Sequence, residues 1–144
     1  MPEVKFYGEA DDRLLKYAVV VARAGGRWVF CKHRERDTWE VPGGHREAGE
    51  SIEDAARREL REETGAKEYT IRPVCVYSVT VPDSRNGDAE ETYGMLFCAE
   101  IASFEEELHH EIERIRITDR LPEAWTYPLI QPALIEEAER RGCL

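Results

Sequence analysis

The chain has 144 residues, of which 42% are hydrophobic and 35% are charged, and its 30 acidic residues outnumber 20 basic ones to give a net charge of −10. This composition excludes a disordered or fibrous protein and predicts one folded domain over residues 1–144. The negative charge argues against bulk binding to nucleic acid or to an anionic membrane, because both need an excess of lysine and arginine.

The sequence predicts a cytoplasmic location. Its longest uninterrupted apolar run, residues 17–22, is far too short to cross a bilayer. Glu3, Lys5 and Glu9 give the N-terminal segment mixed charges in place of the pattern of a secretion signal. The four cysteines are scattered, with no C-x-x-C pair and no histidine at zinc-finger spacing. We therefore expect reduced cysteines rather than a disulfide or a zinc site.

In chain order, the first predicted element is a β-hairpin that opens the fold. Residues 14–33 read as two strands joined at Gly25 and Gly26, a two-residue turn whose glycines tolerate positive φ angles. A short extended segment, TWEVPGG at residues 38–44, follows. A helix is expected next, from a cap at Ser51 to a stop at Gly65.

The second half of the chain is predicted to be mostly strand. Residues 69–81 indicate one or two strands, residues 82–91 a polar loop, and residues 92–101 a further strand. This part of the sequence therefore supplies most of the expected sheet.

An acidic, irregular segment at residues 103–111 separates this sheet from the last elements. Residues 112–118 alternate as a strand, and residues 131–141 predict a closing helix that begins near Pro132. This order of elements predicts an α+β fold, with a mixed sheet and helices packed against its faces.

Acidic side chains interrupt the apolar face of the first helix. On a helical wheel, Glu59 and Glu63 fall within about 60° of Ile52, and Glu62 falls within about 80°. Gathered carboxylates repel each other unless cations neutralise them. Mg²⁺ prefers oxygen ligands, so the spacing of these three glutamates favours a divalent metal site. The alternative is an ordinary acidic surface, which would leave Glu59 and Glu63 pointing into solvent.

Two further residues are candidates for supporting this cluster. Arg58 lies four residues before Glu62, so its guanidinium can hold a carboxylate in one orientation. Glu50 precedes the helix and suits three roles: a helix-terminus charge, a further metal ligand, or a partner of Arg58. Spacing does not separate these roles.

Residues 44–66, GHREAGESIEDAARRELREETGA, resemble the Nudix box, G-x5-E-x7-R-E-U-x-E-E-x-G-U, where U is aliphatic. The segment WEVPGG just before it also resembles the family, as does the order of strands and helices over nearly the whole chain. Ala66 is smaller than the usual last residue of the box. All seven fixed letters are present, as Gly44, Glu50, Arg58, Glu59, Glu62, Glu63 and Gly65.

The resemblance implies a Nudix-type α/β/α sandwich and Mg²⁺- or Mn²⁺-dependent hydrolysis of a nucleoside diphosphate linked to another moiety. It also implies a role for each residue of the box. Metal would be bound by Glu59, Glu62, Glu63 and the Gly44 carbonyl, with Arg58 and Glu50 organising the cluster.

The resemblance leaves the general base open, because the base of this family lies either in the box or in a later loop. Glu63 competes with the acidic segment further along the chain, in which Glu111 is favoured because it directly precedes a predicted strand. The implied catalytic residues are therefore Arg58, Glu62, Glu63 and Glu111; the other candidate bases are Glu105, Glu106 and Glu107.

The substrate needs cations for its phosphates and a platform for its base. Arg34, Arg36 and Arg46 flank the box and are candidates for the phosphates, whereas Trp39 and Tyr127 are candidates for the base. Surface solubility and core packing are the respective alternatives.

The compact chain is most similar to MutT-type nucleoside triphosphate pyrophosphohydrolases, of the kind that sanitise 8-oxo-dGTP. An ADP-ribose or nucleotide-sugar pyrophosphatase is one alternative, because an ADP-ribose subgroup carries a proline where Pro82 stands here. An RNA 5′-pyrophosphohydrolase and a nucleotide-sensing module without activity are others. The expected partner is a small nucleotide, and a homodimer is compatible with this interpretation.

Overall fold

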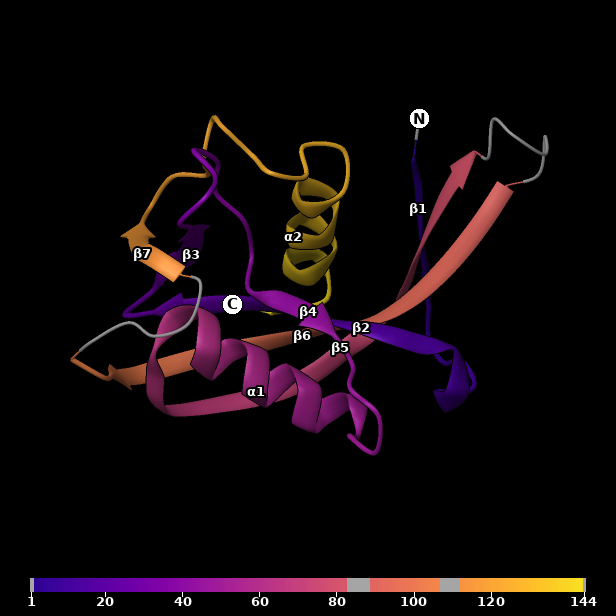
Figure 1. Ribbon diagram of the computed structural model, residues 1–144, viewed down its shortest axis with the longest axis horizontal. Coiled ribbons are helices and arrows are strands. Elements are labelled where there is room, and N and C mark those ends of the chain that lie inside the picture. The colour runs from indigo at the N-terminus through magenta and orange to yellow at the C-terminus, as the bar shows by residue number, and fades with distance from the viewer. Residues whose placement is uncertain (1, 83–88, 107–111, 144) are drawn as a thin grey trace.

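The computed structural model describes residues 2–82, 89–106 and 112–143, which form one mixed seven-stranded sheet and two α-helices (Figure 1). A 3-10 turn, Asp12–Leu14, precedes the second strand. The helices are α1 (Ile52–Thr64) and α2 (Gln131–Arg140). The strands are β1 (Glu3–Tyr7), β2 (Leu15–Ala24), β3 (Arg27–His33), β4 (Gly43–His45), β5 (Ala66–Pro82), β6 (Ala89–Phe104) and β7 (Ile112–Thr118).

The sheet has the order β1-β5-β6-β2-β3-β7, and β4 pairs with β2 beside this path. Strands β2 and β6 run parallel, whereas the other pairs are antiparallel. Figure 1 shows α1 and α2 on opposite faces of the sheet. The expected α/β/α sandwich with a mixed sheet is therefore confirmed.

Strand β2 lies in the middle of this sandwich and is buried on both faces. Ala18 and Val20 belong to the apolar cluster that includes α1, whereas Val19 and Val21 belong to the cluster that includes α2. Successive side chains of a strand point to opposite faces, so a strand covered on both sides needs an uninterrupted apolar run. Each of these valines contributes about 1.5–3 kcal/mol by leaving water.

The structure confirms the first predicted hairpin and the first predicted helix, α1, at the turn and cap residues expected from the sequence. Gly25 and Gly26 have φ angles of 58° and 81°, as the tight turn between β2 and β3 requires. The Ser51 side chain accepts a hydrogen bond from the Asp54 amide at 3.0 Å. Gly65 has a left-handed φ of 75° and ends the helix.

The expectation that the hairpin opens the fold is wrong. Strand β1 comes first. It pairs antiparallel with β5, which lies far along the chain, so no neighbouring turn in the sequence indicates this pairing. The acidic segment is also shorter than expected, because Ser103 and Phe104 continue β6. The polar loop expected at residues 82–91 is shorter too, because Pro82 ends β5 and β6 begins at Ala89. Of these two expected loops, residues 83–88 and 107–111 lie outside the described residues.

Within residues 2–82, 89–106 and 112–143, neither helix is long and apolar enough to cross a membrane. All four cysteines are buried and free.

Candidate active site

The acidic face of α1 turns toward the sheet. Glu63 is 5% exposed, and the side chains of Glu59 and Glu62 are 13% and 33% exposed. Ala56 and Leu60 on the same helix are fully buried. An ordinary acidic surface would require Glu59 and Glu63 to project into bulk solvent, and they do not.

Arg58 is the centre of an ion-pair network at this face. Its Nε and Nη2 atoms donate to the two carboxylate oxygens of Glu50, at 2.7 and 3.0 Å. Its Nη1 atom donates to Glu59 at 2.8 Å and to Glu62 at 3.4 Å. The hydrogen bonds from Arg58 lower the pKa of Glu50 to about 2. Of the three roles open to Glu50, the geometry selects partner of Arg58.

Two glycines bring the backbone against the carboxylates of α1. The Gly43 amide donates to Glu63 Oε1 at 2.6 Å. A Cβ atom at Gly44 would lie 2.6 Å from Glu59 Oε1, so a side chain there would displace the Glu59 carboxylate. Glycine at this position therefore leaves Glu59 in the place where Arg58 holds it.

His33 and Glu40 complete the cluster, and the sequence analysis did not single them out. His33 Nε2 lies 2.9 Å from Glu63 Oε2 and 2.8 Å from Glu40 Oε1. The hydrogen bond with Glu63 raises the pKa of His33. Burial raises the pKa of Glu63 to about 7, although the hydrogen bonds from His33 and Gly43 act in the opposite direction. Three ionisable side chains, those of His33, Glu40 and Glu63, thus meet in a largely buried space.

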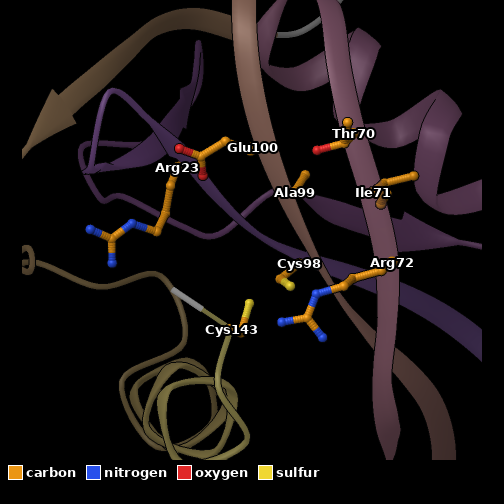
Figure 2. A pocket seen from close by; sticks show the side chains of 8 residues that line it. All are labelled: Arg23, Thr70, Ile71, Arg72, Cys98, Ala99, Glu100 and Cys143. Atoms are coloured by element: carbon orange, nitrogen blue, oxygen red, sulfur yellow. The ribbon is translucent and has the colours of Figure 1, made fainter.

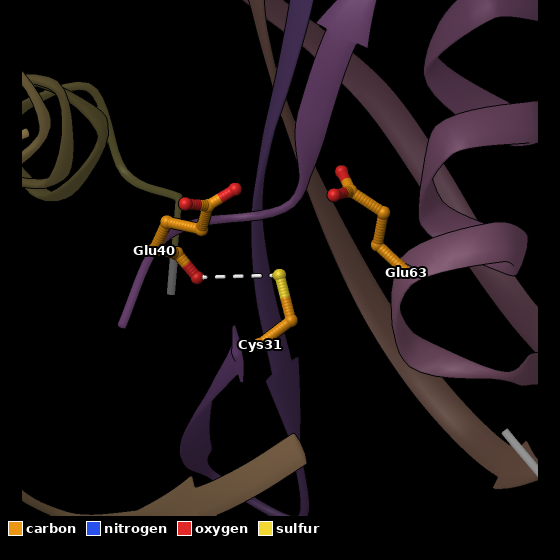
Figure 3. A group of neighbouring side chains, drawn as sticks. All are labelled: Cys31, Glu40 and Glu63. Carbon is orange, nitrogen blue, oxygen red and sulfur yellow. Dashed lines mark hydrogen bonds between the residues drawn. The ribbon is translucent and has the colours of Figure 1, made fainter. Parts of the chain in front are cut away.

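Cys31 lies beside these two acids. Its sulfur atom and one carboxylate oxygen each of Glu40 and Glu63 all lie within 4.8 Å of one another. Figure 3 shows the two glutamates reaching this place from different elements, with a hydrogen bond of 3.5 Å from the Cys31 thiol to the Glu40 carbonyl. Burial raises the pKa of Cys31, and the neighbouring carboxylates add to this effect. Two carboxylates and one thiol meet here, so oxygen atoms are the majority of the available donors.

Two of the predicted substrate residues lie together next to this cluster. Arg36 Nη1 lies 3.2 Å from Glu40 Oε2 and 3.5 Å from the Tyr127 hydroxyl. Its guanidinium also lies over the Tyr127 ring, 6.0 Å from the centroid. A chain of polar contacts therefore runs from Glu63 through His33 and Glu40 to these exposed side chains.

The other three predicted substrate residues have different surroundings. Trp39 is buried, with the Arg116 guanidinium 4.2 Å from the ring centroid. Arg46 donates through all three guanidinium nitrogens, to Asp12, to the Leu15 carbonyl and to the Glu50 carbonyl. Arg34 is exposed. Because Arg46 already makes these contacts, a phosphate would have to displace them to reach its guanidinium.

The candidate bases beyond the box are only partly described. Glu105 and Glu106 are exposed, and the Glu105 amide donates to the Gly65 carbonyl at 2.7 Å. Glu107 and Glu111 lie outside the described residues. Strand β7 begins at Ile112, which pairs with His33.

Comparisons with known proteins find relatives of this chain. A family model described as NUDIX domain matches residues 12–137. Among curated proteins, "Putative 8-oxo-dGTP diphosphatase YtkD" of Bacillus subtilis (strain 168) is 41% identical over 64 residues, which are 44% of this chain and 40% of that protein. A "MutT-like protein" of Streptomyces ambofaciens is 42% identical over 63 residues, covering 44% of this chain and 41% of the relative. The matches thus span about two fifths of these relatives.

Solved structures share the fold over most of the chain. The crystal structure of the Bacillus subtilis pyrophosphohydrolase BsRppH has a TM-score of 0.76 at 23% identity and covers 96% of this chain and 91% of its own. A NUDIX hydrolase from Nitrosomonas europaea has a TM-score of 0.67 at 22% identity, covering 88% and 89%. At these identities the likeness establishes the sandwich and nothing finer.

Proposed function

The chain belongs to the Nudix family, and on that premise we propose that it is a divalent-metal-dependent hydrolase that releases pyrophosphate from nucleoside triphosphates. One observation carries the proposal: Glu59, Glu62 and Glu63 are gathered on one partly buried face of α1, and protein donors already contact all three carboxylates. A nucleotide-sensing module without activity would not need this complete set of carboxylates.

The residues present fit a hard divalent cation. The donors are carboxylate oxygens, which Mg²⁺ and Mn²⁺ prefer. A Cβ atom at Gly44 would overlap the Glu59 carboxylate, so glycine lets the backbone lie directly against this acid. We infer that Glu59, Glu62 and Glu63 hold the ion together with the Gly44 carbonyl. When bound, it would neutralise charge on the phosphates and lower the pKa of an attacking water.

The protein's own contribution is to hold these acids in place. Arg58 donates hydrogen bonds to both Glu50 and Glu59, and these bonds fix the separation of the two carboxylates. His33 and the Gly43 amide occupy one lone pair on each oxygen of Glu63 and fix its plane. Glu63 is our first choice for the group that accepts the proton of water, because it is the acid of the box on which contacts from both His33 and Gly43 converge.

We place the rest of the nucleotide on Arg36 and Tyr127. Both are partly exposed, and Arg36 reaches the Glu40 carboxylate beside the cluster. A guanidinium can meet a phosphate, and a tyrosine ring can stack on a base. The curated name of the Bacillus subtilis relative favours 8-oxo-dGTP among the triphosphates. A cytoplasmic location would suit such a substrate.

A substrate panel tests the proposal. The purified chain is incubated with 8-oxo-dGTP, ordinary nucleoside triphosphates, ADP-ribose, a nucleotide sugar and triphosphorylated RNA, with Mg²⁺ and separately with Mn²⁺. We expect monophosphate and pyrophosphate from the triphosphates, with 8-oxo-dGTP preferred. Cleavage restricted to ADP-ribose or to RNA ends would replace the proposed substrate. Nucleotide binding without any cleavage would instead identify a sensor.

A further inference from the structure

A pocket of about 300 Å³ lies between the sheet and the end of α2 (Figure 2). It is lined by residues from β2, β5 and β6 and by the segment that follows α2. Two cysteines face it, Cys98 from β6 and Cys143 after α2. Arg23, Arg72 and Glu100 also line it, and Figure 2 shows the Arg72 guanidinium as the positive charge near Cys98.

The two cysteines form a pair built by the tertiary fold. Both side chains line the same pocket although the two residues are far apart in sequence, and the two thiols are near enough to influence each other. Cys98 is 8% exposed and Cys143 is 3% exposed. Cys143 is held in position because its amide donates to the Ala138 carbonyl at 2.8 Å, directly after the left-handed Gly142. The pocket therefore gives limited access to the sulfur atoms of both residues.

The surroundings give the two thiols different roles. The nearby Cys143 thiol lowers the pKa of Cys98 to about 7, and Arg72 acts in the same direction against burial and Glu100. Arg72 is fixed beside the pair because its Nη2 donates to the Gly142 carbonyl at 2.9 Å. Cys98 in turn raises the pKa of Cys143. Cys98 is thus suited to react as a thiolate and Cys143 to remain a thiol until needed.

We propose that Cys98 and Cys143 are a modification site, at which hydroperoxides convert a reactive and a resolving cysteine into a reversible disulfide. The Cys98 thiolate attacks the peroxide oxygen and the O–O bond breaks, which leaves a sulfenic acid on Cys98 and releases water or an alcohol after protonation. The Cys143 sulfur then attacks the sulfenic sulfur. The S–S bond forms, the S–O bond breaks, and the hydroxyl leaves as water with the thiol proton.

The other two cysteines provide internal controls. Burial raises the pKa of both Cys31 and Cys75. Both side chains are buried, and the Cys31 thiol donates to a backbone carbonyl. Neither lines the Cys98 pocket. Oxidation through this site should therefore be selective among the four thiols of the chain.

Peroxide treatment followed by alkylation under denaturing conditions tests the proposal. We expect the folded chain to lose the mass of two hydrogen atoms and to yield a peptide in which Cys98 and Cys143 are cross-linked, while Cys31 and Cys75 are alkylated. A thiol reductant should restore all four alkylation sites. If peroxide leaves both cysteines alkylatable, or links either one to Cys31, Cys75 or a second chain, the pair is not the site.

The Cys143→Ser variant tests the order of the two steps. Without the resolving thiol, the reaction should stop at the sulfenic acid, and dimedone should label Cys98. The Cys75→Ala variant is the matched control and should form the cross-link as the native chain does. A folded Cys143→Ser variant that carries no label at Cys98 would overturn the proposal. The readout is mass, so it does not depend on the hydrolytic activity.

Discussion

Helices α1 and α2 have the same architectural position, since each covers one face of the sheet, but their buried acids are held differently. On α1, Glu63 receives hydrogen bonds from His33 and Gly43, which belong to other parts of the chain. On α2, Glu137 pairs with Arg140 and Arg141 of the same helix end. Both carboxylates are buried, so burial does not distinguish them.

The source of the partners does distinguish them. An acid paired within its own helix is satisfied by local geometry and stays with that helix wherever it packs. An acid fixed by distant segments has a defined place relative to the whole molecule, which is what a metal or substrate needs. The origin of its hydrogen-bond donors therefore distinguishes a buried helical carboxylate that is positioned for a site from one that is paired only within its own helix.

The largest expected effect is on catalysis, at the acids of α1. Glu63→Gln and Glu62→Gln should each lower metal-dependent hydrolysis on the order of 10³-fold, because a bound metal supplies several kcal/mol of charge stabilisation. Glu137→Gln on α2 is the matched control and should retain activity. Pyrophosphate release at saturating nucleotide measures all three. Undiminished turnover in both α1 variants would remove the proposed mechanism.

The next expected effect is on stability, and here the helices should behave alike. Leu60 of α1 and Leu134 of α2 are both fully buried. Leu60→Ala and Leu134→Ala should each lower the free energy of unfolding by about 2–5 kcal/mol, through lost contacts and a cavity. Urea denaturation measures both. A change below about 1 kcal/mol in one of them would mean that its helix is not part of the cooperative core.

A smaller effect is expected at the distant partners of Glu63. His33→Ala should raise the Mg²⁺ concentration for half-maximal activity by about 10–100-fold, because it frees the Glu63 carboxylate. His33→Gln keeps a donor and should recover part of the loss. The KM for the nucleotide at saturating Mg²⁺ should change little. A loss confined to KM would instead make His33 a substrate-binding residue.

The smallest expected effect concerns the pair between Glu50 and Arg58. Arg58 holds the pKa of Glu50 at about 2, below its ordinary 4.5, so the pair stabilises the fold above pH 4.5 and this stabilisation is lost as the pH falls toward 2. Glu50→Gln should lower the free energy of unfolding by about 1–2 kcal/mol near neutral pH. Denaturation curves should show this gap closing in acid. A gap that does not change with pH would contradict the pairing.

The sequence predicted those parts of the fold that local chemistry determines. Ser51 and Gly65 bound α1 because a cap and a left-handed glycine act within one turn. Gly25 and Gly26 placed the hairpin for the same reason. Strand β1 was missed because the residues of β5 that pair with it lie about half the chain away in sequence.

The candidate site divides in the same way. The glutamates of α1 were predictable because helical spacing alone puts them on one face. His33 and Glu40 meet Glu63 only in the folded chain. A weak signal did exist: alternation along β3 places His33 on the same face as Cys31 and Val29, and Val29 packs in the α1 cluster.

Strand β2 has a consequence for how the molecule opens. It is paired with β6 on one edge and with β3 and β4 on the other, and side chains of both helix clusters cover its faces. The amides of Val19, Val20 and Val21 can therefore reach solvent only when the sheet separates and both helices leave. Their hydrogen-exchange rates should report global unfolding, which makes the centre of β2 an internal standard against which local opening elsewhere can be measured.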